Sequence, residues 1–245
     1  MFGIIKNIKE ATDLSTVITY RTNAFNIMVC DTRKTVLTVD GNKNIDDSIL
    51  KMHYIEGFGF ISGVGIGELI QDTFNDFQNK SHCIDNLLCS FFAAYDRIAS
   101  ECNKEVLMLL NKTGVIASTQ DQIIIMSNSL PYPKKIASLR ENTVHIDFPF
   151  DCKKTARSLL QKKGEYLQAE SPFDALIPIL EMFQSIAQNS EDVSSIACIS
   201  IMGASNNYPF FAQGEVDDLL SALKSNTKSN IKNSFEERKS QLLIW

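Results

Sequence analysis

The spacing of apolar residues changes repeatedly along this chain of 245 residues, and these changes constrain the fold more than any other feature. Up to Gly67 the apolar residues cluster in short β-rich runs separated by polar turns, which predicts antiparallel hairpins. After Gly67 they recur every three or four residues, as on one face of a helix. The strands expected before Gly67 span 17–20, 27–30, 35–39, 50–56 and 58–62, and the helices expected after it span 70–77 and 84–98.

The second half of the chain repeats this order. Continuous apolar runs such as VLMLL and IIIM favour strands that are covered on both faces. Ser171 and Pro172 predict the start of a further amphipathic helix, because serine caps helices and proline is favoured at their first position. The strands expected here span 105–111, 115–119, 122–127, 143–148, 196–202 and 208–212, and the helices span 152–163, 172–187 and 215–224.

Hairpins build antiparallel sheets, and helices with a single apolar face must cover those sheets. Two stacked antiparallel sheets between two helical layers satisfy both requirements. We therefore predict an α+β fold, a four-layer αββα sandwich. We expect residues 15–225 to form one such domain, preceded by an N-terminal extension or propeptide (1–14) and followed by a polar C-terminal tail (226–245).

The charge and hydropathy of the chain narrow its partners and its location. A formal net charge of −5 gives no basic field that would favour nucleic acid or an anionic membrane. No apolar run reaches the length of a membrane-spanning helix, and the first residues hold too short an apolar run for a signal peptide. We therefore expect a cytoplasmic protein without a nucleic-acid or membrane partner.

Residues that could hold a metal or a cofactor are scattered. The six cysteines have no paired spacing, and His53, His82 and His145 are far apart in the sequence, so a zinc site is not expected. The glycines between residues 57 and 67 form neither a GxGxxG pattern nor a P-loop, which argues against a nucleotide site. We expect no cofactor.

The first hairpins carry the residue types that acyl transfer requires. Ser15 offers a hydroxyl nucleophile, Lys51 an amine, and Asp31 a carboxylate that could hold this amine in place. The Ser62-Gly63 turn offers a backbone N–H for a developing oxyanion. The order of these residues along neighbouring strands indicates a minimal acyl-transfer site.

These residues also resemble a known family. The segment STVITYRTNAFNIMVCDTR, followed by Lys51 and ISGVGIG, is similar to the N-terminal nucleophile (Ntn) hydrolases of the proteasome type, with proteasome β-subunits and the bacterial peptidase HslV as the most similar members. The resemblance implies that Ser15 is the nucleophile, Asp31 the acid and Lys51 the lysine of the family. It also implies that Gly63 supplies the oxyanion N–H.

The resemblance extends more thinly to later segments. MSNSLPY (126–132) resembles the family's Gly-Ser-Gly-x-Pro-aromatic turn and implies that Ser127 supports the nucleophile. The sequence DVSS (192–195) resembles an Asp-x-x-Ser motif and implies supporting roles for Asp192 and Ser195. The family further implies a peptide or small amide substrate and self-association into a ring or a dimer.

Two departures keep other interpretations open. Serine stands where this branch usually has threonine, and Leu14 precedes it where self-processing subunits carry glycine. Ser15 would act as a nucleophile only if removal of residues 1–14 frees its α-amine.

Each site residue also has a structural interpretation. Asp31 and Lys51 could form a purely structural ion pair, and Gly63 could serve the close approach of a strand to a helix. Ser127, Asp192 and Ser195 could be turn residues or helix caps. The alternatives to a hydrolase are therefore an inactive, unprocessed proteasome-like subunit that serves as an assembly or binding module, and an unrelated αβ protein.

Overall fold

The computed structural model describes residues 15–37, 43–130, 135–148, 158, 169, 171–203 and 209–225. Within these residues the chain forms two five-stranded antiparallel sheets, a two-stranded ribbon and five helices with defined bounds. The strands are β1 (Val17–Arg21), β2 (Phe25–Asp31), β3 (Lys34–Leu37), β4 (Lys43–Asp46), β5 (His53–Ile55), β6 (Gly59–Val64), β7 (Gly114–Thr119), β8 (Ile123–Ser127), β9 (Ile136–Ser138), β10 (Thr143–Asp147), β11 (Ile196–Gly203) and β12 (Phe210–Glu215). The helices are α1 (Gly67–Gln78), α2 (Ile84–Glu101), α3 (Lys104–Lys112), α5 (Pro172–Ala187) and α6 (Val216–Lys224).

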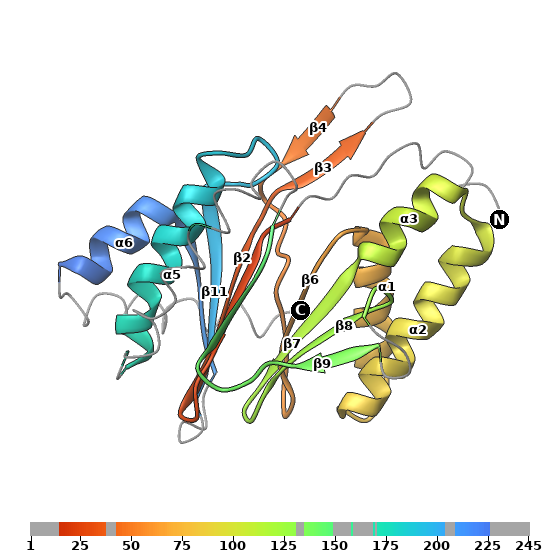
Figure 1. The fold of residues 1–245 in the computed structure, drawn as a ribbon, viewed down its shortest axis with the longest axis horizontal. Helices are drawn as coiled ribbons and strands as arrows, with labels where there is room; N and C mark the ends of the chain where they lie inside the picture. Colours follow the sequence, from red (N-terminus) through yellow and green to blue (C-terminus); the bar gives the residue numbers. More distant parts are fainter. Residues whose placement is uncertain are drawn as a thin grey trace.

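The first sheet has the strand order β10-β1-β2-β11-β12. Its centre is the predicted hairpin of β1 and β2, in which Val17 lies opposite Cys30. Side chains alternate across β2, since successive residues of a strand point to opposite faces. Ile27 and Val29 pack with α5 and α6, whereas Met28 and Cys30 pack on the other side. One face of this sheet is therefore covered by helices (Figure 1).

The second sheet has the order β5-β6-β7-β8-β9, and α1, α2 and α3 pack on one of its faces. Its other face meets the first sheet. Phe60 and Ile116 of this sheet share a buried cluster with Val17, Met28 and Cys30 of the first sheet. Figure 1 shows α5 and α6 beside the first sheet, and α1, α2 and α3 at the far side of the second.

The strand predicted at 105–111 is wrong, because these residues belong to α3. The side chain of Asn103 caps the helix by accepting a hydrogen bond from the backbone N–H of Val106. Val106 and Leu110 are buried one turn apart, whereas Met108 between them is 57% exposed. A short apolar run fits a strand or a helix, and only the cap and the one-sided burial distinguish the two.

The other helices and strands predicted in the described residues are present. Two strands, β4 and β9, were not predicted. In β4, Asn44, Ile45 and Asp46 are all exposed, so the sequence shows no apolar face there. β9 has only three residues, none of them fully buried. The predicted helix at 152–163 lies outside the described residues except for Ser158, which is helical. The proposed extension (1–14) and tail (226–245) also lie outside the described residues. Among the helices that the structure describes, none has both the length and the apolar character needed to cross a bilayer.

Candidate active site

Ser15, Asp31 and Lys51 meet at one end of the first hairpin. The ammonium of Lys51 donates to the hydroxyl oxygen of Ser15 at 2.7 Å and to a carboxylate oxygen of Asp31 at 3.1 Å. Ser15 lies just before β1, Asp31 ends β2, and Lys51 lies just before β5. Because β1 and β2 pair without a bulge at this end, the start of one strand faces the end of the other. The amine therefore bridges the hydroxyl and the carboxylate across two sheets.

The backbone also holds the Asp31 carboxylate in place. One oxygen accepts from the backbone N–H of Thr16 at 2.9 Å, and the other accepts from that of Arg33 at 2.9 Å. Asp31 is fully buried, and the Lys51 side chain is 10% exposed. Burial raises the pKa of the Asp31 carboxyl above its ordinary value, and the ammonium of Lys51 together with these two N–H groups opposes that shift. Three hydrogen-bond donors thus offset part of the cost of burying the Asp31 carboxylate away from water.

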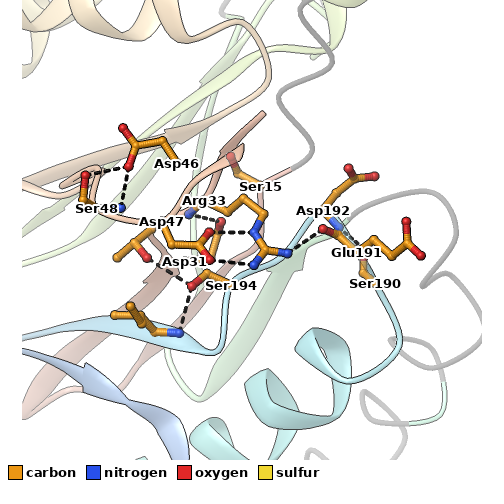
Figure 2. A network of polar contacts seen from close by, with 12 residues as sticks. Ser15, Asp31, Arg33, Asp46, Asp47, Ser48, Ser190, Glu191, Asp192 and Ser194 are labelled. Atoms are coloured by element: carbon orange, nitrogen blue, oxygen red, sulfur yellow. Dashed lines mark hydrogen bonds and ion pairs between the residues drawn. The ribbon is translucent and has the colours of Figure 1, made fainter. Parts of the chain in front are cut away.

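Arg33 forms an ion pair with Asp47 beside the site (Figure 2). The guanidinium of Arg33 donates from Nε and Nη2 to the two carboxylate oxygens of Asp47, both at 2.6 Å, and from Nη1 to the carbonyl oxygen of Glu191 at 2.6 Å. These hydrogen bonds hold the pKa of Asp47 below its ordinary value. The contacts of Arg33 connect the end of β2 to the segment that leads to Lys51 and to the turn before β11. Sequence analysis missed Arg33 and Asp47, although Arg33 follows Asp31 by only two residues.

A cavity of about 330 Å³ opens beside the Ser15 hydroxyl. Ser15, Lys51 and Gly63 line it together with residues at the start of α1. A Cβ at Gly63 would lie 2.7 Å from the carbonyl oxygen of Gly114 and 2.8 Å from the side chain of Ile70. Gly63 is thus both adjacent to the cavity and required by a close approach of strand to helix, so the functional and the structural interpretation of this glycine each have a physical basis.

The remaining predicted site residues, Ser127, Asp192 and Ser195, have contacts of their own. The Ser127 hydroxyl hydrogen bonds with the carbonyl of Asn111 at 3.5 Å and with the hydroxyl of Ser129 at 2.9 Å. Asp192 lies in the turn that Arg33 contacts through Glu191. The hydrogen bond to Asp47 is the main cause of a raised pKa of Arg33, and the charge of Asp192 adds to it. These contacts bring Asp192 to the edge of the site, whereas those of Ser127 lie among residues of α3 and the turn after β8.

Ser195 is exposed, and its carbonyl accepts from the backbone N–H of Val216 at the start of α6. Its neighbour Ser194 is fully buried. The Ser194 hydroxyl oxygen accepts from Thr32 at 3.2 Å and from the backbone N–H of Ile196 at 3.0 Å. Ser194 therefore connects β11 to the residue that follows Asp31.

Among the residues that the structure describes, no three His, Cys, Asp or Glu side chains lie together as a possible metal site. The described groups that lie against the Ser15 hydroxyl are a cation and, behind it, a carboxylate.

The fold and the site together define an α+β protein of two antiparallel sheets, with a serine hydroxyl, a lysine and an aspartate at one end of the first hairpin. Solved structures with this fold exist. Anbu (Gly-1 mutant) from Hyphomicrobium sp. strain MC1 matches with a TM-score of 0.60 at 11% sequence identity, covering 89% of this chain and 96% of that chain. Anbu, described as an ancestral beta-subunit, from Yersinia bercovieri matches with a TM-score of 0.60 at 10% identity, covering 89% and 94%.

A further structure of Anbu from Hyphomicrobium sp. strain MC1 has a TM-score of 0.58 at 12% identity, covering 89% and 96% of the two chains. No family model and no curated protein matches the sequence. These likenesses establish that the chain shares the fold of Anbu.

Proposed function

We propose that this protein is a proteasome/HslV-like Ntn hydrolase that cleaves amide bonds in peptides or small amides, with Ser15 as nucleophile once residues 1–14 are removed. The proposal includes the four-layer αββα arrangement of residues 15–225. The observation that carries it is the 2.7 Å hydrogen bond from the Lys51 ammonium to the Ser15 hydroxyl, with Asp31 behind the lysine. The shared fold of Anbu and the motif order of the sequence support it.

The proposed reaction follows from these groups. The free α-amine of Ser15 accepts the hydroxyl proton while the oxygen attacks the acyl carbon. The Lys51 ammonium favours the developing alkoxide, and the hydrogen bond to Asp31 orients that lysine. The backbone N–H of Gly63 donates to the oxyanion. The amine product leaves with the proton, and water then hydrolyses the ester and restores the serine.

Removal of residues 1–14 is assigned to the same hydroxyl. Ser15 attacks the carbonyl carbon of Leu14, the peptide nitrogen of Ser15 becomes a free amine, and water hydrolyses the resulting ester. The products are a carboxylate at Leu14 and an α-amine at Ser15. Leucine adopts the required backbone geometry less readily than glycine does, so we expect this step to be slow.

Intact-mass measurement combined with an amide-hydrolysis assay tests the proposal. The purified wild-type chain should yield a species that begins at Ser15 and hydrolyses peptide amides. Ser15→Ala should remain full length and inactive, and Lys51→Ala should lose at least about 100-fold in turnover, as expected when one stabilising donor is removed. Lys104→Ala, an exposed lysine at the start of α3, is the matched control and should keep full activity. Hydrolysis that survives in Ser15→Ala would refute the assignment.

A second candidate is an unprocessed, catalytically inactive proteasome-like subunit that acts as an assembly or binding module. It is favoured by one observation: Leu14 occupies the amide nitrogen of Ser15, so the unprocessed chain lacks the general base. The Asp31–Lys51 pair then has a structural role. Both candidates include self-association into a ring or a dimer in the cytoplasm, without nucleic-acid or membrane partners. Sedimentation should therefore find a discrete assembly at micromolar concentration, and a monomer would contradict this part.

A further inference from the structure

Two cysteines face each other in the centre of the first sheet. Cys30 of β2 lies directly opposite Cys198 of β11, and these two strands are antiparallel neighbours (Figure 1). Residues that lie directly opposite each other in such a pair have Cα atoms about 4.5–5.5 Å apart and side chains on the same face. A disulfide requires a Cα separation of about 4.4–6.8 Å. The register of the two strands therefore meets this condition.

The two thiols touch each other and are shielded from solvent. Both side chains lie on the face of the first sheet that meets the second sheet, and neither is exposed. The thiols of Cys30 and Cys198 hydrogen bond with each other, and this contact together with burial raises the pKa of Cys198 well above its ordinary value. Both cysteines are free. They form a buried pair of thiols in direct contact.

The pair adjoins the carboxylate of the candidate active site. Asp31 follows Cys30 along β2, and it lies opposite Ala197, the neighbour of Cys198. The charge of Asp31 raises the pKa of the Cys198 thiol, and the charge of Lys51 lowers it. A covalent bond between the two cysteines would therefore join β2 to β11 at the residue before Asp31.

The other described cysteines lie elsewhere in the fold. Cys83 and Cys102 flank α2 and Cys89 lies within it, and this helix packs on the second sheet at its outer face. Cys83 and Cys89 are exposed, whereas Cys102 is partly buried. Among the cysteines that the structure describes, the facing one is thus the partner within reach of each buried thiol.

We infer that Cys30 and Cys198 form a reversible redox pair, which hydrogen peroxide oxidises to a cross-strand disulfide. One thiolate attacks a peroxide oxygen and breaks the O–O bond, which gives a sulfenic acid and, with the thiol proton, a molecule of water. The second thiol attacks the sulfenic sulfur, forms the S–S bond and releases a second water. Two thiols are oxidised and one hydrogen peroxide is reduced. A dithiol reductant restores both thiols by exchange.

Burial determines the rate and the product of this oxidation. A buried thiol with a raised pKa holds little thiolate, so the pair should react more slowly than the exposed Cys83 and Cys89. Because the two thiols already touch, the facing cysteine traps the sulfenic acid before further peroxide or a bulkier thiol reaches it. The inference does not rest on the proposed hydrolase, since it needs only the register and the contact of the two cysteines.

Peptide mapping of the full chain tests the inference. The reduced protein is incubated with hydrogen peroxide in the absence of denaturant, its remaining free thiols are alkylated, and it is digested without reduction. We expect a linked peptide pair that contains Cys30 and Cys198 and that separates after treatment with dithiothreitol. Calorimetry of the oxidised protein should show a Tm higher by roughly 5–15 °C, because the bond closes a long loop of the chain.

Two variants assign the rise in Tm to this bond. Cys30→Ala and Cys198→Ala each remove one partner, and neither should gain thermal stability on oxidation. Cys89→Ala, an exposed cysteine of α2, is the matched control and should keep both the linked peptide and the rise in Tm. The peptide map of the wild-type chain remains decisive where an alanine variant fails to fold.

Three results would overturn the inference. The first is recovery of Cys30 and Cys198 as free thiols from protein in which Cys83 and Cys89 are oxidised. The second is an oxygenated form of either buried cysteine without a linked peptide. The third is a rise in Tm on oxidation that persists in both alanine variants.

Discussion

Replacement of Asp31 by asparagine tests the electrostatic design of the site. Asp31 is fully buried and accepts hydrogen bonds from Thr16, Arg33 and Lys51. Asparagine has the same shape but only one acceptor oxygen, so its amide NH2 must face a donor. The ammonium of Lys51, only 10% exposed, also loses its counter-charge.

The magnitude follows from these two losses. Removing one partner of a buried ion pair costs about 3–5 kcal/mol. We expect the lower end, about 3 kcal/mol, because Lys51 keeps its hydrogen bond to Ser15. In a chain of this size this loss lowers Tm by roughly 6–12 °C.

Urea titration and calorimetry of four proteins measure this effect: the wild type, Asp31→Asn, Lys51→Met and the double variant. The double variant removes both charges and should be more stable than the sum of the single effects predicts, with a coupling energy of at least about 1 kcal/mol. Asp121→Asn, at an exposed turn between β7 and β8, is the matched control. If Asp31→Asn changed stability by less than about 1 kcal/mol, or if the two effects were additive, the electrostatic reasoning would be wrong.

Three further predictions concern the surroundings of the site. Gly63→Ala should destabilise the protein by about 1–3 kcal/mol in urea titration, since its Cβ would lie 2.7 Å from a backbone oxygen, whereas Gly214→Ala, whose Cβ would meet nothing closer than 3.6 Å, should be tolerated. Hydrogen bonds to Arg33 lower the pKa of Asp47 in the folded protein. The stability that Asp47 contributes is therefore present above the unfolded-state pKa of 3.8 and is lost as the pH falls through the lower folded-state pKa. The stability difference between wild type and Asp47→Asn should shrink in acid. Ser194→Ala should cost about 1–2 kcal/mol because it leaves the partly buried N–H of Ile196 and the buried hydroxyl of Thr32 without their acceptor. Equal effects of Ser194→Ala and the exposed Ser195→Ala would contradict this assignment.

The core of the fold was predictable where the apolar period is regular. Alternation along β2 separates Ile27 and Val29 from Met28 and Cys30, and the structure assigns these two sets to different cores. The period fails at α3, where five consecutive apolar residues fit two structures, and the decisive feature is a cap from Asn103. It also fails at β4, because an exposed ribbon needs no apolar pattern, and at β9, because three residues are too few to show one.

The site was predictable only in part. Ser15, Asp31 and Lys51 were identified as candidates by their residue types and their order, and they meet because the hairpin register brings strand ends together. Arg33 and Asp47 were missed, since an ion pair between a strand end and a later segment has no local sequence pattern.

The N-terminal residue of the protein recovered from its native cell tests the central proposal most directly. A hydrolase of the proposed kind must carry the free α-amine of Ser15, so the account predicts chains that begin with Ser-Thr-Val-Ile. A population in which Leu14 still precedes Ser15 throughout would contradict it.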